Sequence, residues 1–163
     1  MLPRIIAFAG AAKSGKDSVG QHFARLGYQR LAFADELKRR AAVALGTDVE
    51  TINARKDELR PALVAIGAGA RAIDPLIWVR AVERQICRPG LFVVCDLRYE
   101  NERRMIARHG GAVVYVERNG VDFANDEERR TLPEVRERAD MILTNDDPAA
   151  AAARVRSFLE SAA

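Results

Sequence analysis

Short apolar runs alternate with longer amphipathic stretches along most of the chain. The run at residues 91–95 is continuous enough for a strand that is buried on both faces of a sheet. Four further runs, at 5–9, 28–33, 112–116 and 141–143, read as strands as well. Strands that alternate with helices from end to end are typical of an α/β chain with a parallel sheet. We therefore expect an α/β protein with a five-stranded parallel sheet flanked by helices.

The amphipathic segments carry helix start and stop signals. Asp35 and Asp74-Pro75 are typical helix starts, whereas Gly27 and Gly46 are typical of helix ends. The spacing of apolar residues predicts helices over 16–26, 35–45, 57–65, 75–86, 100–109 and 133–138, and from 148 onward.

Two stretches lack apolar periodicity, namely residues 47–56 and 119–131. The glycines at 67–69 predict a flexible stretch between helices. We expect a single domain over 1–163, with a substrate-covering insertion near 47–72 and a lid-like segment near 119–131.

Composition and charge narrow the class of protein. A chain of 163 residues with 48% apolar and 30% charged residues suits a globular domain with a core of its own. The net charge of +3 is too small to argue for binding of a nucleic-acid polymer. No apolar run approaches the roughly 18 residues that span a bilayer, and the strand that starts near residue 5 leaves no room for a signal peptide. We expect a cytoplasmic protein.

Residues 10–18 carry the strongest chemical signal. They read Gly-Ala-Ala-Lys-Ser-Gly-Lys-Asp-Ser, between an expected strand and an expected helix. In such a loop the backbone N–H groups point at phosphate oxygens, and the helix adds the positive end of its dipole. Lys16 would reach the β- and γ-phosphates of ATP; a glycine-rich turn with a chance lysine is the alternative. The expected phosphate-binding residues are Gly10, Lys13, Ser14, Gly15, Lys16, Asp17 and Ser18.

Two carboxylates are candidates for a magnesium site. The residue after the loop lysine is usually Ser or Thr, whose hydroxyl holds Mg²⁺; here it is Asp17, with Ser18 beside it. A carboxylate holds Mg²⁺ directly or through water. Asp96 follows the run 91–95, at the sheet edge where P-loop proteins place an acid that holds Mg²⁺ or its waters. Asp96 would also accept a proton from the attacking group, unless it merely caps the next helix.

Charged residues that follow the expected strands are candidates for binding a second substrate. Arg98 lies on the same side as the acid two residues before it and can grip a phosphate with two N–H groups. Asp35 and Lys38 follow the second strand; a capped helix with a solvated lysine is their alternative. Arg118 follows the fourth strand and is the expected lid arginine, which would close over the transferring phosphate.

Another group of candidates lies around the glycines at 67–69. Arg71 follows them and can swing toward a bound phosphate. Arg60 either contacts the same phosphate or is a solvated helix residue. Trp78, after the helix start at 74–75, belongs either to the site or to the core.

Taken together, these segments resemble the phage-type deoxynucleoside monophosphate kinases. In that family the loop commonly contains Ser-Gly-Lys-Asp-Thr, and this chain has Ser-Gly-Lys-Asp-Ser at 14–18. Further similar segments lie, in the family's order, at 33–38, 69–79, 96–102 and 139–145. The chain departs from the family at 131–134, where a Glu is present but the expected His is not. The animal phosphomevalonate kinases share the Gly-Lys-Asp loop and the Asp-x-Arg segment.

The resemblance implies a three-layer P-loop fold, transfer of the γ-phosphoryl of ATP with Mg²⁺ to a deoxynucleoside monophosphate (dNMP), and allows a homodimer. The resemblance also implies a protein of the bacterial cytoplasm, encoded either by the bacterium or by a phage that infects it. Lys16 would hold the donor phosphates, Asp17 and Asp96 the metal, and Arg118 the charge in transfer. The residues that would bind the acceptor are Asp35, Lys38, Arg60, Arg71, Trp78, Arg98 and Glu102. Two alternatives stay open: a kinase for another small acceptor such as phosphomevalonate or dephospho-coenzyme A, and a non-catalytic nucleotide-binding regulator.

Overall fold

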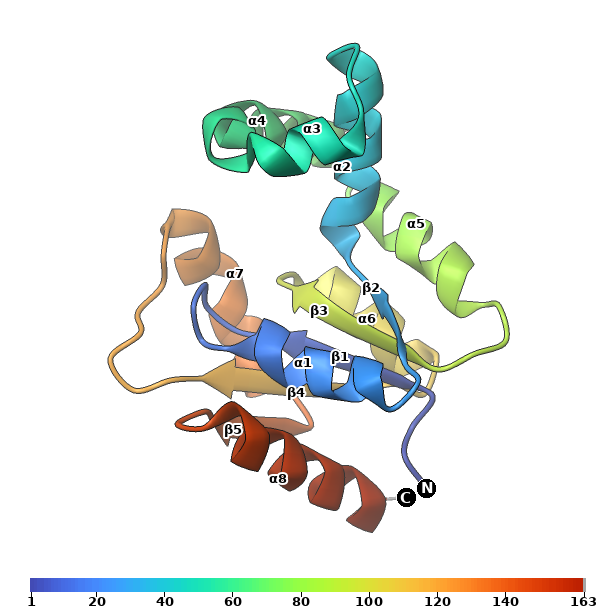
Figure 1. Cartoon of the computed structure of the whole chain (residues 1–163), viewed down its shortest axis with the longest axis vertical. Helices are drawn as coiled ribbons and strands as arrows, with labels where there is room; N and C mark the ends of the chain where they lie inside the picture. The colour runs from blue at the N-terminus through green and yellow to red at the C-terminus, as the bar shows by residue number, and fades with distance from the viewer. Residues whose placement is uncertain (163) are drawn as a thin grey trace.

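The computed structural model of the chain describes residues 1–162. Its centre is a sheet of five parallel strands in the order β2-β3-β1-β4-β5 (Figure 1). The strands are β1 (Ile5–Ala9), β2 (Gln29–Leu31), β3 (Phe92–Leu97), β4 (Ala112–Glu117) and β5 (Met141–Thr144). The expected α/β class and the five-stranded parallel sheet are confirmed.

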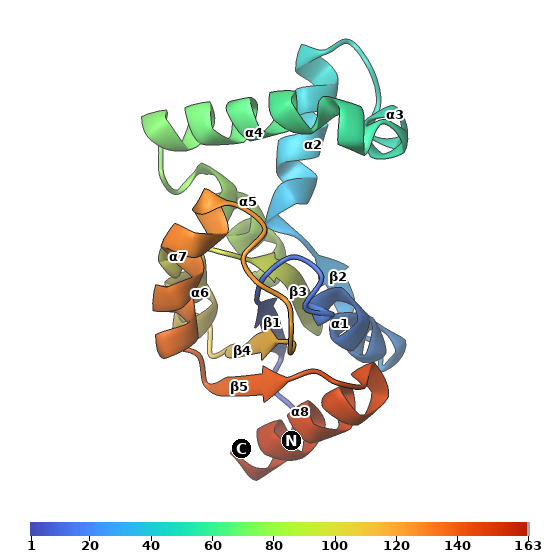
Figure 2. The same ribbon diagram turned by 90° about the vertical axis from the view of Figure 1, so that its left-hand side faces the viewer.

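Helices cover both faces of this sheet. In the described residues they are α1 (Lys16–Arg25), α2 (Phe33–Ala44), α3 (Val49–Ala54), α4 (Lys56–Ile73), α5 (Ile77–Ile86), α6 (Glu100–Arg108), α7 (Asp126–Glu137) and α8 (Pro148–Ser161). Helices α1 and α8 pack on one face, and α5, α6 and α7 share a core with the other face (Figure 2). The fold therefore has three layers.

The first strand shows why both faces need a helical cover. Ile5, Ala7 and Ala9 point into the core beneath α5–α7, whereas Ile6 and Phe8 point into the core beneath α1 and α8. All five residues are fully buried. Because successive side chains of a strand point to opposite faces, a continuous apolar run buries both of them.

Helices α2, α3 and α4 form an arm, residues 33–73, beyond the carboxyl ends of the strands (Figures 1 and 2). The arm has a small core of its own around Ala41, Ile52 and Leu63. The segment 47–56 is more helical than the sequence predicts. Asp48 starts α3 there, because its side chain accepts a hydrogen bond of 2.6 Å from Thr51 N.

The prediction of a flexible stretch at 67–69 was wrong, because α4 continues through these residues to Ile73. A Cβ atom on Gly67 would lie 3.3 Å from Leu37 Cδ2, and Trp78 Nε1 donates to Gly67 O at 3.4 Å. Gly67 therefore allows α4 to pack closely against its neighbours and does not provide a hinge.

The helix expected at 133–138 begins earlier, at Asp126. Asn125 caps it by accepting a hydrogen bond of 2.9 Å from Glu128 N. The buried residues of α7 are Glu128, Leu132 and Val135, which have helical spacing. The apolar pattern alone did not predict the early start of α7, because the first buried position of this helix is a glutamate.

In the described part of the chain, no single helix is long and apolar enough to cross a membrane. The pair α4 and α5 reaches that length and composition only together, with a bend of 91° between them.

Candidate functional site

The loop between β1 and α1 has the backbone of an anion-binding loop. Gly10, Lys13 and Gly15 have φ values of 142°, 68° and 88°. A Cβ atom on Gly10 would lie 2.1 Å from Val116 O, so the loop can approach β4 only with glycine there. Helix α1 starts directly after Gly15, so its unpaired first-turn N–H groups and its dipole meet at the loop.

Lys16 lies across this loop. Its side chain is 5% exposed, and its Nζ donates to Ala11 O at 3.1 Å. Burial lowers the pKa of Lys16 from its ordinary value. Asp17 and Ser18 follow in the exposed first turn of α1.

A buried asparagine holds the loop from the far side. Asn145 follows β5, is 2% exposed, and donates from Nδ2 to Ser14 O at 2.8 Å. Its own backbone N–H donates to Glu117 O at 2.7 Å. A Cβ atom on Gly15 would lie 2.0 Å from this Nδ2, so the second loop glycine makes the contact possible. Sequence reasoning placed Asn145 in a similar segment but not in the site.

A cavity of about 310 Å³ lies between the loop, the ends of β2 and β3, and the arm. The structure brings ten of the sequence-predicted residues to it: Lys16, Asp17, Asp35, Lys38, Arg60, Arg71, Trp78, Asp96, Arg98 and Glu102. Sequence reasoning missed the lining residues Arg30, Lys56, Asn125 and Glu127. Basic side chains outnumber acidic ones in this lining, so the cavity is suited to an anionic ligand.

Asp96 caps a helix, although not the next one in the chain. Its two carboxylate oxygens accept hydrogen bonds from Phe33 N at 2.8 Å and Ala34 N at 2.9 Å. Helix α2 has no side-chain cap of its own, so Asp96 supplies it from the end of β3. Burial raises the pKa of Asp96 despite these two donors.

The metal expectation can be tested on the donor set. Within residues 1–162 no group of three or more His, Cys, Asp or Glu side chains gathers around one point. Asp17 and Asp96 line the same cavity and offer the hard oxygen ligands that Mg²⁺ prefers. Mg²⁺ usually takes one or two carboxylates together with water and phosphate oxygens, so this pair fits a magnesium ion that arrives with a nucleotide.

Arg71, Arg98 and Glu102 form a connected cluster beside the cavity. The Arg71 guanidinium lies 4.2 Å from the centre of the Tyr99 ring and 4.0 Å from Glu102 Oε1. Glu102 is 2% exposed and accepts hydrogen bonds from Arg98 N at 2.8 Å and Tyr99 N at 3.1 Å. Burial raises the pKa of Glu102 to about 8. At neutral pH this carboxyl is mostly protonated, so it orders the loop while it leaves the charge of Arg71 available.

Two glutamates in the first turn of α7 lie beside Arg98, and one of them, Glu127, lines the larger cavity. Arg98 Nη1 lies 3.8 Å from Glu127 Oε2 and 3.4 Å from Glu128 Oε1. The Tyr99 hydroxyl donates to Glu127. Glu128 also accepts a hydrogen bond from Ala12 N, with both of its oxygens at 3.2 Å. No sequence motif predicts that these two glutamates belong to the site, because acidic residues in the first turn of a helix are common and interact favourably with the helix dipole.

The other predicted residues have ordinary contacts. Trp78 is 2% exposed and belongs to the core as well as to the cavity wall. Lys38 donates to Asn53 Oδ1 at 2.8 Å, and Asp35 lies 3.9 Å from Arg30. Arg60 is exposed at the cavity.

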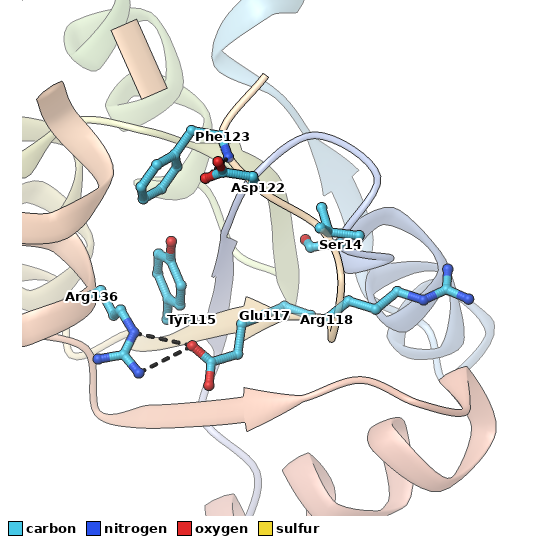
Figure 3. Close-up of a pocket in the computed structure, with 10 residues that line it drawn as sticks. Ser14, Tyr115, Glu117, Arg118, Asp122, Phe123 and Arg136 are labelled. Carbon is cyan, nitrogen blue, oxygen red and sulfur yellow. Dashed lines mark hydrogen bonds and ion pairs between the residues drawn. The ribbon is translucent and has the colours of Figure 1, made fainter. Parts of the chain in front are cut away.

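Arg118 lies elsewhere. It borders a second cavity, of about 230 Å³, together with Ser14, Tyr115 and Phe123, and its side chain extends away from that cavity (Figure 3). In the same view Glu117 is paired with Arg136 at 3.1 Å. The structure does not bring the expected lid arginine together with the residues of the larger cavity.

Solved structures of P-loop kinases share this fold. Shikimate kinase from Acinetobacter baumannii in complex with shikimate is 18% identical, with a TM-score of 0.58 over 99% of this chain and 94% of that chain. Dephospho-CoA kinase from Campylobacter jejuni is 11% identical, with a TM-score of 0.54 over 97% and 96%. A further solved structure, TT1252 from Thermus thermophilus, whose name states no activity, is 18% identical, with a TM-score of 0.60 over 99% of this chain and 98% of that chain. At these identities the likeness shows the P-loop kinase fold alone, so the resemblance to dNMP kinases stays a prediction.

Two curated proteins of Ictalurid herpesvirus 1 (strain Auburn) are similar in sequence, whereas no family model matches the chain. The uncharacterized protein ORF76 is 28% identical over 85% of this chain, which spans 60% of that protein's length. The uncharacterized protein ORF77 is 30% identical over 94% of this chain and 69% of its own length. Because that similarity extends over more than two thirds of both proteins, the chain belongs to the same family as ORF77 of Ictalurid herpesvirus 1.

Proposed function

We propose that the protein transfers the γ-phosphoryl group of ATP to a small phosphorylated acceptor, and that this acceptor is a deoxynucleoside monophosphate. The observation that carries the proposal is that Lys16 of the loop and Arg98 beyond β3 line the same cavity. A phosphate bound on the loop and a phosphate bound in the cavity would therefore meet there. The P-loop kinase fold supports the reaction class, and the resemblance of segments 33–38, 69–79 and 96–102 supports the dNMP.

The loop would hold the donor. Its backbone N–H groups and the start of α1 favour the β-phosphate, and Lys16 would exchange its bond to Ala11 O for a phosphate oxygen. Asp17, with Asp96 in support, would hold Mg²⁺, which neutralises charge on the donor phosphates when it is bound. Asp17 is exposed in the first turn of α1, which leaves its oxygens accessible to a metal ion.

The cavity would hold the acceptor. Arg98 and Arg71 are the arginines placed by Glu102 and Tyr99, and a guanidinium binds phosphate with two parallel N–H groups. Arg60 would approach the same phosphate from the arm. A cavity of about 310 Å³ lies at the lower end of the sizes that hold small-molecule ligands.

Phosphoryl transfer to such an acceptor needs positioning and charge stabilisation more than proton transfer. A phosphate monoester has its second pKa near 6, so most of the acceptor carries no proton on the attacking oxygens at neutral pH. The reaction therefore does not require Asp96 as a general base, and its carboxylate can cap α2. Arg98 would stabilise the charge in transfer; Arg118 would do so only after a movement of the segment 118–125 that brings it to the cavity.

The test is ADP release from ATP·Mg²⁺ with each dNMP, each NMP, phosphomevalonate and dephospho-coenzyme A in turn. The proposal expects stimulation by one or more dNMPs. Stimulation by another acceptor alone would correct the substrate, and ATP binding without any stimulation would favour the non-catalytic regulator.

Lys16→Ala should lower turnover by on the order of 100-fold or more, with Arg25→Ala at the far end of the same helix as the control. Normal turnover of a folded Lys16→Ala variant would contradict the proposed donor site.

A further inference from the structure

Glu128 places a buried carboxylate on the phosphate-binding loop. It lies in the first turn of α7 and is 1% exposed. Its oxygens accept hydrogen bonds from Ala12 N at 3.2 Å and from Ala124 N at 2.9 Å. Arg98 Nη1 lies 3.4 Å from Oε1.

These partners are of the kind that a phosphate oxygen would use. A loop N–H group and an arginine are the donors that the proposed reaction requires at the transferring phosphate. That phosphate must lie on the side of the loop that faces the acceptor cavity, and Arg98 lines this cavity. The carboxylate therefore lies where the terminal phosphate of the donor would arrive.

A carboxylate and a phosphate cannot both use these donors, because two anions in a water-poor site repel each other strongly. A bound diphosphate would leave these donors to Glu128, whereas a triphosphate would have to displace the carboxylate. Displacement lowers the apparent affinity of the triphosphate by the fraction of molecules in which the carboxylate has left.

We propose that Glu128 sets how the loop discriminates between nucleoside di- and triphosphates, by weakening the binding of the triphosphate: its carboxylate takes the place of the terminal phosphate when no nucleotide is bound and gives up Ala12 N and Arg98 when a triphosphate binds. The inference rests on the donor site of the proposed function and is independent of the identity of the acceptor. Because Ala124 N also binds this carboxylate, departure of Glu128 releases the segment that precedes α7.

The test is calorimetric binding of ADP·Mg²⁺ and of the non-hydrolysable triphosphate AMP-PNP·Mg²⁺. Glu128→Gln keeps an acceptor oxygen for Ala12 N but removes the charge. It should bind AMP-PNP about tenfold more tightly, equivalent to about 1.4 kcal/mol, with ADP affinity changed by less than about twofold. Glu137→Gln is the matched control, because it removes an exposed glutamate charge at the other end of α7; its AMP-PNP affinity should change by less than about twofold.

An unchanged AMP-PNP affinity of Glu128→Gln, an equal gain for ADP, or an equal gain in Glu137→Gln would overturn the role of Glu128 alone. Failure of the wild-type protein to bind either nucleotide would contradict the proposed donor site as well.

Amide exchange provides a second readout on the unmodified protein, should the variant not fold. AMP-PNP should speed exchange at Ala124 N, whereas ADP should not. Equal protection of this amide with both nucleotides would refute the displacement.

Discussion

Gly20 lies in the middle of α1, where the helix that begins with Lys16 packs against β3. A Cβ atom at this position would lie 2.4 Å from Cys95 Sγ and 3.5 Å from Phe8 Cδ2. Non-bonded carbon atoms prefer a separation near 3.5–4.0 Å, so Gly20→Ala forces either the buried sulfur or the helix to move.

Two opposing effects set the size of the change. Alanine is better than glycine inside a helix by about 0.8–1.0 kcal/mol. Overpacking of a well-filled core costs about 1–3 kcal/mol, and Cys95 is 1% exposed, so its sulfur has little room to turn. The difference predicts a net loss of about 1 kcal/mol and at most about 2 kcal/mol, which corresponds to a melting temperature lower by about 2–8 °C for a chain of this size.

A double-mutant cycle separates the two effects. Cys95→Ala removes the sulfur, so the added methyl group of Gly20→Ala should be tolerated and should partly fill the space that is left. Urea unfolding of the wild type, both single variants and the double variant should give a coupling free energy of about 1–3 kcal/mol in favour of the double variant. A Gly20→Ala variant more stable than the wild type, with no coupling to Cys95, would refute the packing argument.

Three other expectations follow from the site. The folded state keeps the proton of Glu102 over roughly pH 4.5 to 8 while the unfolded chain loses it, so stability falls as pH rises through that window by at most about 1.4 kcal/mol per pH unit. Glu102→Gln should flatten that slope in urea unfolding, and equal slopes would contradict the buried, protonated carboxyl. Asn145→Ala should cost about 1–3 kcal/mol, because the buried Ser14 O loses its partner; an unchanged melting temperature would show that the contact is dispensable. In steady-state kinetics Arg98→Ala should raise the acceptor KM by about tenfold or more, and Arg118→Ala should raise it less; equal effects would show that Arg118 reaches the acceptor.

The strands and the loop were predictable because their signals are local. A continuous apolar run, followed by Gly10 and Gly15 and then by Lys16, predicts a strand, a turn and a helix within about fifteen residues. Arg98 was predictable for the same reason, because it follows a strand, whereas Glu102 was named only through the resemblance to dNMP kinases.

Contacts between distant segments could not be read in this way. Asp96 caps a helix that begins 63 residues earlier, so nothing next to Asp96 in the sequence reveals its partners. Arg30 and Lys56 reach the cavity from β2 and α4 without belonging to any motif. The role of Glu128 could not be predicted for two reasons. A buried acid interrupts the apolar pattern of α7, and its partner Ala12 lies 116 residues away in the sequence.

The central claim is that the loop and the cavity act together on two phosphorylated ligands. Acceptor-dependent ADP formation from ATP·Mg²⁺, measured with each dNMP for the wild type, Lys16→Ala and Arg98→Ala, tests it most directly. The account predicts strong stimulation of the wild type by at least one dNMP and a severe loss in both variants. Tight binding of ATP, with no ADP formed in the presence of any dNMP, would contradict it.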